Sequence, residues 1–237
     1  MWSYYGSKSK IIKLYPKPKY DKIIEPFAGT ARYSLRYFEK DVLLIDKYDV
    51  VVKIWKWLQL CSPNDILKLP KLKIGDNINE MNLSEEEKLF LGMEAAVASL
   101  APRNKVTKFS SEQNVRHNRL RRISSQLFKI KHWKIKLGNY DEINNQKATW
   151  FIDPPYQFGG HSYVHSNKNL NYEKLAMWCK ERLGQTIVCE NTKANWMDFN
   201  PMKKIKGASN IATTEAIWSN VATSYNVKQL NLINDNT

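Results

Sequence analysis

Four consecutive residues, Asp153-Pro154-Pro155-Tyr156, combine groups that suit chemistry on an aromatic amine. The lone pair of an exocyclic amine is delocalised into its ring, so a site that makes the nitrogen nucleophilic needs acceptors for the amine hydrogens. The Asp153 carboxylate and the Pro154 carbonyl are two such acceptors, Pro155 restricts the backbone, and Tyr156 offers a face on which a base stacks. These residue types fit the transfer of an electrophilic methyl group to a base amine.

The position of this segment strengthens that interpretation. It follows directly on the apolar residues 149–152, which read as a buried strand. The alternative is a rigid Asp-Pro turn at a strand end. An amine inside a duplex is reached only when the nucleotide is flipped out, at a cost of a few kcal/mol, which stacking on Tyr156 would help to offset.

Two other strand ends carry residues suited to a ligand. Gly29 follows an apolar strand at 22–27, and Asp46 ends the next one at 42–45. Ligands of parallel α/β sheets bind at the carboxyl ends of the strands, where a glycine admits close backbone approach and a carboxylate accepts hydrogen bonds from ribose hydroxyls. For Asp46 the alternative is an ordinary strand-end residue. The phosphate-binding Gly-x-x-x-x-Gly-Lys spacing is absent, which disfavours nucleoside triphosphate chemistry.

These motifs together resemble the D12-class adenine-specific DNA N6-methyltransferases. In that family the Asp-Pro-Pro-Tyr loop forms the target-amine site. Three more segments resemble the family: 4–10 (YYGSKSK), 25–31 (EPFAGTA), where Ala31 replaces a glycine, and 137–141 (LGNYD), where Asn139 replaces an aspartate. The resemblance implies S-adenosylmethionine as cofactor, with cofactor-binding residues Tyr4, Lys8, Glu25, Phe27, Gly29, Asp46, Asn139, Tyr140 and Asp153. Tyr140 would stack on the cofactor or fill the core.

The elements that must position these residues alternate between strand and helix. Strands are predicted at 22–27, 42–45, 134–137, 149–152 and 186–189, with helices over 30–39, 48–60 and 170–183. This alternation favours a parallel sheet with right-handed crossovers. We therefore expect an α/β fold, a Rossmann-like methyltransferase sheet with helices on both faces. Short apolar pieces near residues 211, 216–218 and 225–227 predict a closing antiparallel hairpin.

Residues 57–131 interrupt the alternation and predict a small helical insert. It reads as a loop containing Pro63 and Pro70, followed by two helices. The first begins at the capping box 84–87 (SEEE) and carries an apolar stripe as far as Leu100. The second runs from near Ser110 to Ile130. In motif order this is the place of the family's target-recognition region, so we expect a catalytic domain of 1–56 and 132–237 and a nucleic-acid-binding insert of 57–131.

The charge of the chain points to a polyanionic partner. The 237 residues include 37 Lys+Arg and 23 Asp+Glu, a formal net charge of +14, and residues 103–136 contain eleven Lys+Arg and one acidic residue. We expect duplex DNA with a flipped adenine as partner. The nucleic-acid-binding candidates are Arg103, Asn104, Lys105, Arg116, Arg119 and Arg122. The alternative is a solvated basic face without a partner.

Other residue patterns limit the class of protein. Three cysteines, Cys61, Cys179 and Cys189, are odd in number and form no Cys-x-x-Cys pair, which argues against a disulfide framework or structural zinc. His161 and His165 lack a third ligand, so no metal is expected. Without a long apolar run, a soluble cytoplasmic protein is predicted.

The function expected from these residues is methyl transfer from S-adenosylmethionine to the N6 amine of adenine in DNA. The same catalytic loop would serve adenine in RNA. Cytosine N4 methylation is less favoured, because that group more often has Ser at the position of Asp153. From a different class, the chain could be a non-catalytic nucleic-acid-binding protein with a degenerate cofactor pocket, as Ala31 and Asn139 would allow.

Overall fold

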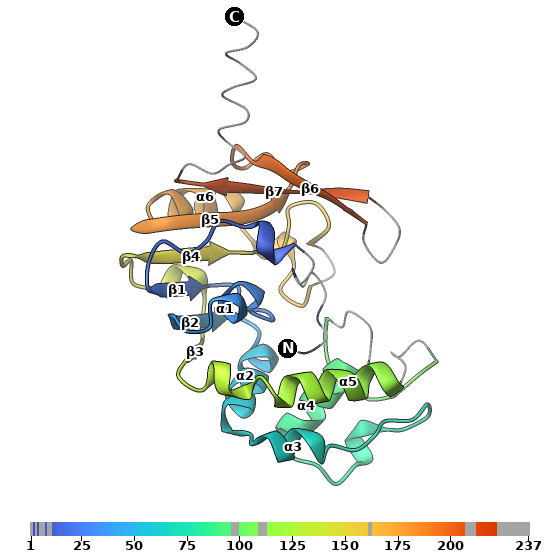
Figure 1. Cartoon of the computed structure of the whole chain (residues 1–237). Coiled ribbons are helices and arrows are strands. Elements are labelled where there is room, and N and C mark those ends of the chain that lie inside the picture. Colours follow the sequence, from blue (N-terminus) through green and yellow to red (C-terminus); the bar gives the residue numbers. More distant parts are fainter. Residues whose placement is uncertain are drawn as a thin grey trace, which may run out of the picture.

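A single mixed sheet forms the centre of the molecule. The computed structural model describes Trp2, Tyr4, Lys8 and residues 11–95, 100–108, 113–160, 163–206 and 212–221, excluding the side chains of 113–116, 205, 206 and 212. The strands are β1 (Lys22–Glu25), β2 (Asp41–Asp46), β3 (Lys134–Leu137), β4 (Ala148–Ile152), β5 (Gly184–Asn191), β6 (Asn200–Lys206) and β7 (Ala212–Ser219). They are arranged in the order β3-β2-β1-β4-β5-β7-β6 (Figure 1). This order confirms the Rossmann-like α/β class.

The parallel strands bring the sequence motifs to one end of the sheet, where the carboxyl ends of the strands lie. β1 pairs in parallel with β2 and β4, with Ile23 opposite Val42 on one side and Thr149 on the other. Every residue of β4 is buried, as are Ile23, Ile24 and Glu25 of β1. Such strands, buried on both faces, read as continuous apolar runs. Because the carboxyl ends of parallel strands lie at the same end of the sheet, the residues that follow β1, β2 and β4 lie near one another.

The helices fall into two groups. Those that alternate with strands are α1 (Arg32–Arg36), α2 (Asp49–Leu60) and α6 (Tyr172–Lys180), whereas α3 (Pro63–Leu67), α4 (Glu85–Glu94) and α5 (Gln113–Ser124) lie together beyond the β3 edge of the sheet (Figure 1). The 3₁₀ turns are η1 (Ile12–Leu14), η2 (Ile78–Glu80), η3 (Leu127–Ile130), η4 (Tyr140–Glu142) and η6 (Asn167–Asn169). α2 buries the apolar face that its sequence predicts, with Ile54 and Trp55 fully buried.

Several helix boundaries differ from prediction. α1 covers only 32–36 of the predicted 30–39. The helix predicted from Ser110 to Ile130 is two elements, because α5 ends at Ser124 and a 3₁₀ turn follows at 127–130. The hydroxyls of Ser124 and Ser125 donate to the carbonyls of Arg121 and Arg122, and such side-chain bonds compete with helix continuation.

Helices α4 and α3 of the insert differ from prediction in separate ways. Ser84 caps α4 in a capping box with Glu87, as predicted, but α4 ends at Glu94; Ala96 and Val97 of the predicted stripe lie outside the described residues. α3 was expected to be loop. Its start carries a signal that Pro63 obscured: Ser62 is the N-cap, Pro63 occupies the first turn, and Asp65 completes a capping box.

An antiparallel hairpin closes the sheet, as predicted, and its first strand, β6, lies before the pieces that the sequence indicated. β6 pairs antiparallel with β7, and β7 pairs antiparallel with β5, so that β7 lies between them. Residues 216–218 belong to β7 as expected. The pieces near 211 and 225–227 lie outside the described residues. The hairpin extends the parallel sheet beyond β5.

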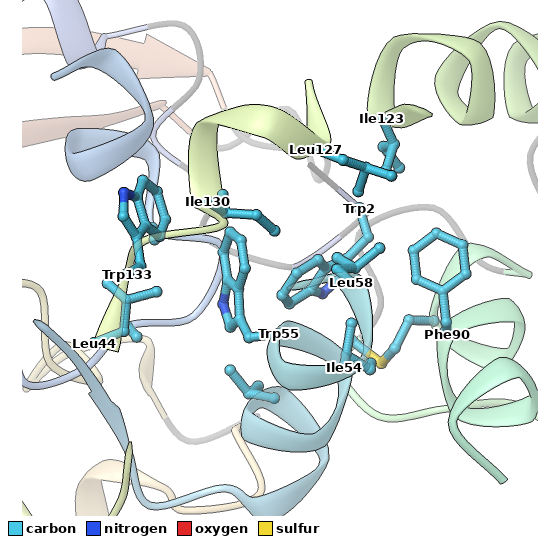
Figure 2. Packing of buried hydrophobic residues seen from close by; sticks show 14 of the residues in the cluster. Trp2, Leu44, Ile54, Trp55, Leu58, Phe90, Ile123, Leu127, Ile130 and Trp133 are labelled. Carbon is cyan, nitrogen blue, oxygen red and sulfur yellow. The ribbon is translucent and has the colours of Figure 1, made fainter. Parts of the chain in front are cut away.

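One buried cluster joins the sheet to the helices of the insert (Figure 2). The ring of Trp2 packs edge-on against Trp55 of α2 at 4.8 Å between centroids, and Trp55 contacts Trp133 at 5.6 Å. Phe90 of α4 and Ile123 of α5 belong to the same cluster as Leu44 of β2. The predicted domain boundary at residue 57 falls inside α2. The division into two domains stays a prediction.

Cys61, Cys179 and Cys189 are free thiols, and all three are buried. Among the helices in the described ranges, none combines the length and the apolar character that crossing a membrane requires.

Candidate active site

A cavity of about 290 Å³ opens at the carboxyl ends of the parallel strands. Its wall is formed by the residues that follow β1, β2, β3 and β4, by Tyr4 and Lys8 from the amino-terminal segment, and by residues 163–166 and 169–171 before α6. The nine residues predicted to bind a cofactor all line it: Tyr4, Lys8, Glu25, Phe27, Gly29, Asp46, Asn139, Tyr140 and Asp153. The structure thus brings together in one cavity residues predicted from four separate motifs and the strand-end residue Asp46.

The loop after β1 adopts a backbone that only some residues accept. Gly29 has φ +44°, and a Cβ there would lie 3.5 Å from the ring of Tyr4. Ala31, where the family motif has glycine, also has a positive φ, +43°, a left-handed conformation that costs a non-glycine residue about 1–2 kcal/mol. The Trp55 indole donates to the Gly29 carbonyl at 2.9 Å. The loop therefore keeps the glycine-type turn despite the alanine.

Two carboxyl groups fix the loop after β1 and the residues around it through hydrogen bonds to backbone N–H groups. Asp46 accepts hydrogen bonds from the backbone N–H of Gly29 and of Tyr48, both at 2.9 Å. Glu25 accepts one from the backbone N–H of Ser34 at 2.7 Å. Burial raises the pKa of Asp46, and burial raises the pKa of Glu25 to about 8, although the bond from Ser34 opposes that rise. Each carboxyl group retains lone pairs that can accept hydrogen bonds from the hydroxyl groups of a ligand.

Aromatic rings form another part of the cavity wall. Phe27 and Tyr140 are stacked with 5.5 Å between their centroids. Tyr140 also packs edge-on against Trp178 of α6 at 5.2 Å. Tyr140 is therefore both a core residue and a cavity residue. The backbone N–H of Asn139 donates to the Glu142 carboxylate at 3.0 Å, which fixes the turn that places Asn139 at the cavity wall.

Asp153 lies in the cavity and is ion-paired. The Lys8 Nζ atom is 3.0 Å from Asp153 Oδ1 and 3.4 Å from Glu215 Oε1 of β7. Burial raises the pKa of Asp153 to about 6; the Lys8 ammonium opposes this rise, and the Glu215 charge adds to it. Asp153 is thus a carboxyl group that titrates just below neutral pH and is a hydrogen-bond acceptor above it.

The Asp153–Tyr156 loop is held on several sides. The Tyr172 hydroxyl of α6 donates to the Pro155 carbonyl at 2.6 Å, and the backbone N–H of Gly160 donates to the Tyr156 carbonyl at 3.0 Å. A Cβ at Gly160 would lie 2.9 Å from the Pro155 carbonyl carbon, so the chain folds back as closely as glycine permits. Pro155 lines the cavity with Asp153, and Pro154 is buried.

Tyr156 contacts charged groups at both its ring and its hydroxyl. Lys8 Nζ lies over the ring, 4.5 Å from its centroid, and the hydroxyl donates to Glu215. The Tyr15 hydroxyl donates to the same Glu215 oxygen at 2.8 Å. Sequence reasoning missed Tyr15 and Glu215. The available signal for Glu215 was a lone acidic residue beside the apolar residues 216–218.

The predicted nucleic-acid-binding residues do not share one environment. Arg103, Asn104 and Lys105 are exposed, on a segment whose backbone is bonded to Gly92 and Ile78. Arg122 of α5 is exposed as well. Arg119 instead pairs with the buried Glu94 of α4 at 2.6 Å. Arg116 lies in α5, and its side chain lies outside the described part of the chain.

Arg32 of α1 is a further basic residue at the cavity that the sequence did not single out. It lines the cavity and donates to the Trp2 carbonyl at 3.5 Å. Burial, together with the nearby charges of Arg122 and Arg119, lowers the pKa of Arg32 to about 10. The guanidinium group of Arg32 in α1 therefore lies near those of Arg119 and Arg122 in α5.

His165 lines the cavity and packs against Tyr48, with 6.1 Å between ring centroids. His161, its partner in the sequence pattern, lies outside the described residues. Within the described ranges, no three His, Cys, Asp or Glu side chains are grouped closely enough to hold a metal ion.

Comparison with known proteins places the sequence in a family. The family described as "D12 class N6 adenine-specific DNA methyltransferase" matches residues 4–229. A search of curated proteins found no match. Among solved structures, the chain is similar to the "putative methyltransferase yhhF" of Escherichia coli, with 9% identity, a TM-score of 0.32, and coverage of 89% of this chain and 78% of that one. It is also similar to a "putative methylase" of Haemophilus influenzae, with 8% identity, a TM-score of 0.36 and coverage of 85% and 80%.

Proposed function

Because the chain belongs to the D12 class of N6 adenine-specific DNA methyltransferases, we propose that it transfers a methyl group from S-adenosylmethionine to the N6 amine of an adenine flipped out of duplex DNA. The observation that carries this proposal is the position of Asp153. It lies, ion-paired with Lys8, in the cavity that also gathers the other seven predicted cofactor residues.

The residues of the cavity fit S-adenosylmethionine. The half-buried Asp46 and the buried Glu25 are acceptors for ribose hydroxyl and amino groups, and the stacked Phe27–Tyr140 pair provides an aromatic wall for an adenine ring. Gly29 lets the backbone approach the ligand closely. When bound, S-adenosylmethionine supplies a methyl group that its sulfonium makes electrophilic.

The target amine would be held by the loop that follows β4. The Asp153 carboxylate and the Pro154 carbonyl would accept the two amine hydrogens, localise the nitrogen lone pair and stabilise the positive charge that develops as the nitrogen forms its new bond. The Pro155 carbonyl is occupied by the Tyr172 hydroxyl. Since Lys8 covers one face of the Tyr156 ring, the flipped base would stack on the opposite face.

The DNA would cross from the cavity to the insert. Arg32 at the cavity, the neighbouring Arg122 and the exposed segment 103–105 would form a basic path between them. Arginine and lysine side chains on such a path neutralise phosphates, and affinity then falls with salt concentration. We expect the protein in the cytoplasm, where its three buried thiols stay reduced.

Replacing Asp153 tests the function. Asp153→Ala should lower methyl transfer to adenine in duplex DNA by about a thousandfold while leaving the thermal transition in place. Asp198→Ala, at an exposed aspartate away from the cavity, is the matched control. Transfer of a radiolabelled methyl group to duplex DNA and to structured RNA, followed by digestion to nucleosides, identifies the modified base.

Three results would contradict the proposal. A folded Asp153→Ala variant with near-full activity would remove Asp153 from the site. Label found in RNA alone, or in cytosine, would assign a different substrate. Failure of the wild-type chain to bind S-adenosylmethionine in calorimetry, with and without DNA, would indicate a non-catalytic nucleic-acid-binding protein.

A further inference from the structure

Glu215 of β7 is a buried carboxylate that joins three functional groups. It is 3% exposed. It accepts hydrogen bonds from the hydroxyls of Tyr156 and Tyr15, and its Oε1 atom is 3.4 Å from Lys8 Nζ. Lys8 in turn reaches Asp153 at 3.0 Å. A chain of polar contacts therefore runs from β7 to both ends of the Asp153–Tyr156 loop.

The sheet fixes the position of this carboxylate. Glu215 is paired with Asn191 of β5 in the antiparallel register, and its neighbours Ala216 and Ile217 are buried. Side chains two apart in a strand share a face, so Glu215 points to the same side as the core residue Ile217. An acidic group in such a strand is costly unless it is fully partnered. Its partners here all belong to the candidate active site or support it.

Building on the proposed methyl transfer, we propose that Glu215 is the positioning residue of the target-amine site. It holds the Tyr156 hydroxyl and the Lys8 ammonium in fixed places, so that Lys8 directs Asp153 and the Tyr156 ring is aligned for the base. Tyr15, from the amino-terminal part of the chain, orients Glu215 through its hydroxyl hydrogen bond. The hairpin β6–β7, which lies outside the family motifs noted in the sequence, thus supplies a functional side chain.

The charge of Glu215 has a second effect on the site. One ammonium, Lys8, faces two carboxylates, so Asp153 shares its cation with Glu215. The groups that act on Asp153 or are acted on by it come from the amino-terminal segment and from β1, β5, β7 and the β4 loop: Lys8, Tyr15, Glu25, Tyr156, Cys189, Glu190 and Glu215. The negative charge of Glu215 raises the pKa of Asp153. Its removal should lower that pKa.

The test is Glu215→Gln, which keeps an acceptor oxygen and removes the charge. We expect a kcat at least about tenfold lower, because Lys8 loses the charge that holds it in place and no longer aligns Asp153, with affinity for S-adenosylmethionine changed less than threefold. The acid limb of the pH–rate profile should move to lower pH. Carboxyl ¹³C NMR of the labelled protein should show the Asp153 titration midpoint moving below its wild-type value, near 6.

Further variants separate charge from shape and keep the test decisive. Glu215→Asp restores the charge, so its pH profile should stay near that of the wild type while kcat remains low. Tyr15→Phe should lower kcat in the same direction by a smaller factor, and it serves if Glu215→Gln does not fold. Glu181→Gln, at an exposed carboxylate after α6, is the matched charge control and should change neither property.

The outcomes distinguish this inference from the proposed function. If wild-type protein methylates DNA but Glu215→Gln leaves kcat and the Asp153 midpoint unchanged, Glu215 is not a positioning residue and the function stands. If wild-type protein methylates nothing, the function fails, and the NMR midpoint still decides whether Glu215 controls Asp153. A loss of kcat without any shift of the midpoint, together with an unchanged Tyr15→Phe variant, would also overturn the inference.

Discussion

At the scale of single residues, Lys8 is the group on which the ionisation of Asp153 depends. Burial pushes the pKa of Asp153 up to about 6, and Lys8 opposes that rise. If the ionised carboxylate is the form that accepts the amine hydrogens, activity falls as the pH drops through this value. On that premise, we expect Lys8 to keep Asp153 ionised at neutral pH.

Lys8→Met removes the ammonium and should raise the pKa of Asp153 above 6. The acid limb of kcat/KM should then move to higher pH, the opposite direction to Glu215→Gln, and activity at pH 7 should fall by at least about tenfold. The measurement is methyl transfer between pH 5 and pH 9. Lys13→Met, at an exposed lysine of η1, is the control. An acid limb that stays in place would show that Lys8 does not set the ionisation of Asp153.

The cavity residues were predictable because short motifs carried them. Gly29, Asp46 and Asp153 each follow an apolar strand, and parallel strands end at one edge of a sheet. Tyr15 and Glu215, which are 200 positions apart, belong to no such motif. Their meeting depends on the antiparallel insertion of β7 beside β5, which local sequence patterns do not encode.

At the scale of elements, α5 carries two arginines with different environments. The sequence places Arg119 and Arg122 on one basic ridge. Arg119 turns toward α4, where Glu94 is 1% exposed, whereas Arg122 is exposed. An ion pair with a buried carboxylate fixes α5 against α4, and an exposed guanidinium is available to a phosphate.

Two single variants should separate these environments. Arg119→Met breaks the pair with Glu94 and should lower the free energy of unfolding by about 3 kcal/mol. Arg122→Ala should change it by less than about 0.5 kcal/mol, weaken DNA binding, and reduce the slope of log affinity against log salt by about 1. Urea denaturation and DNA titrations at several salt concentrations measure both effects. Equal losses of DNA affinity, with both variants as stable as the wild type, would contradict this division.

The elements themselves were predicted best where periodicity was long and uninterrupted. β4 and α2 match expectation within a few residues because each has a clear apolar pattern. α5 was predicted too long because periodicity continues through residues 124–126, where serine side chains bond to the backbone and end the helix. The capping signal at Ser62 was present, but it leads into a helix of only five residues.

At the scale of the whole molecule, buried carboxyl groups give stability an unusual dependence on pH. Burial raises the pKa of Glu25 to about 8 and of Glu190 to about 7, against ordinary values near 4.5. The folded chain therefore binds protons that the unfolded chain releases between about pH 5 and pH 8. Stability should fall as the pH rises through this window.

Unfolding by urea, measured without ligand from pH 5 to pH 9, tests this expectation. The free energy of unfolding should decrease toward pH 8 and then level off. Glu25→Gln keeps an acceptor for the Ser34 N–H and removes the titration, so its curve should be flatter than that of the wild type. A wild-type stability that rises steadily with pH would show that these carboxyl groups are ionised at little cost.

The shared core has a consequence for engineering. Trp2, Trp55 and Trp133 contact side chains from the sheet and from the helices beyond β3 without a break between them (Figure 2). A recognition segment transplanted from a relative would bring its own half of this packing and leave the other half mismatched. If residues 57–131 recognise DNA as proposed, changing the target preference should succeed by redesigning exposed side chains such as those of Arg103 and Arg122, and fail when whole segments are exchanged.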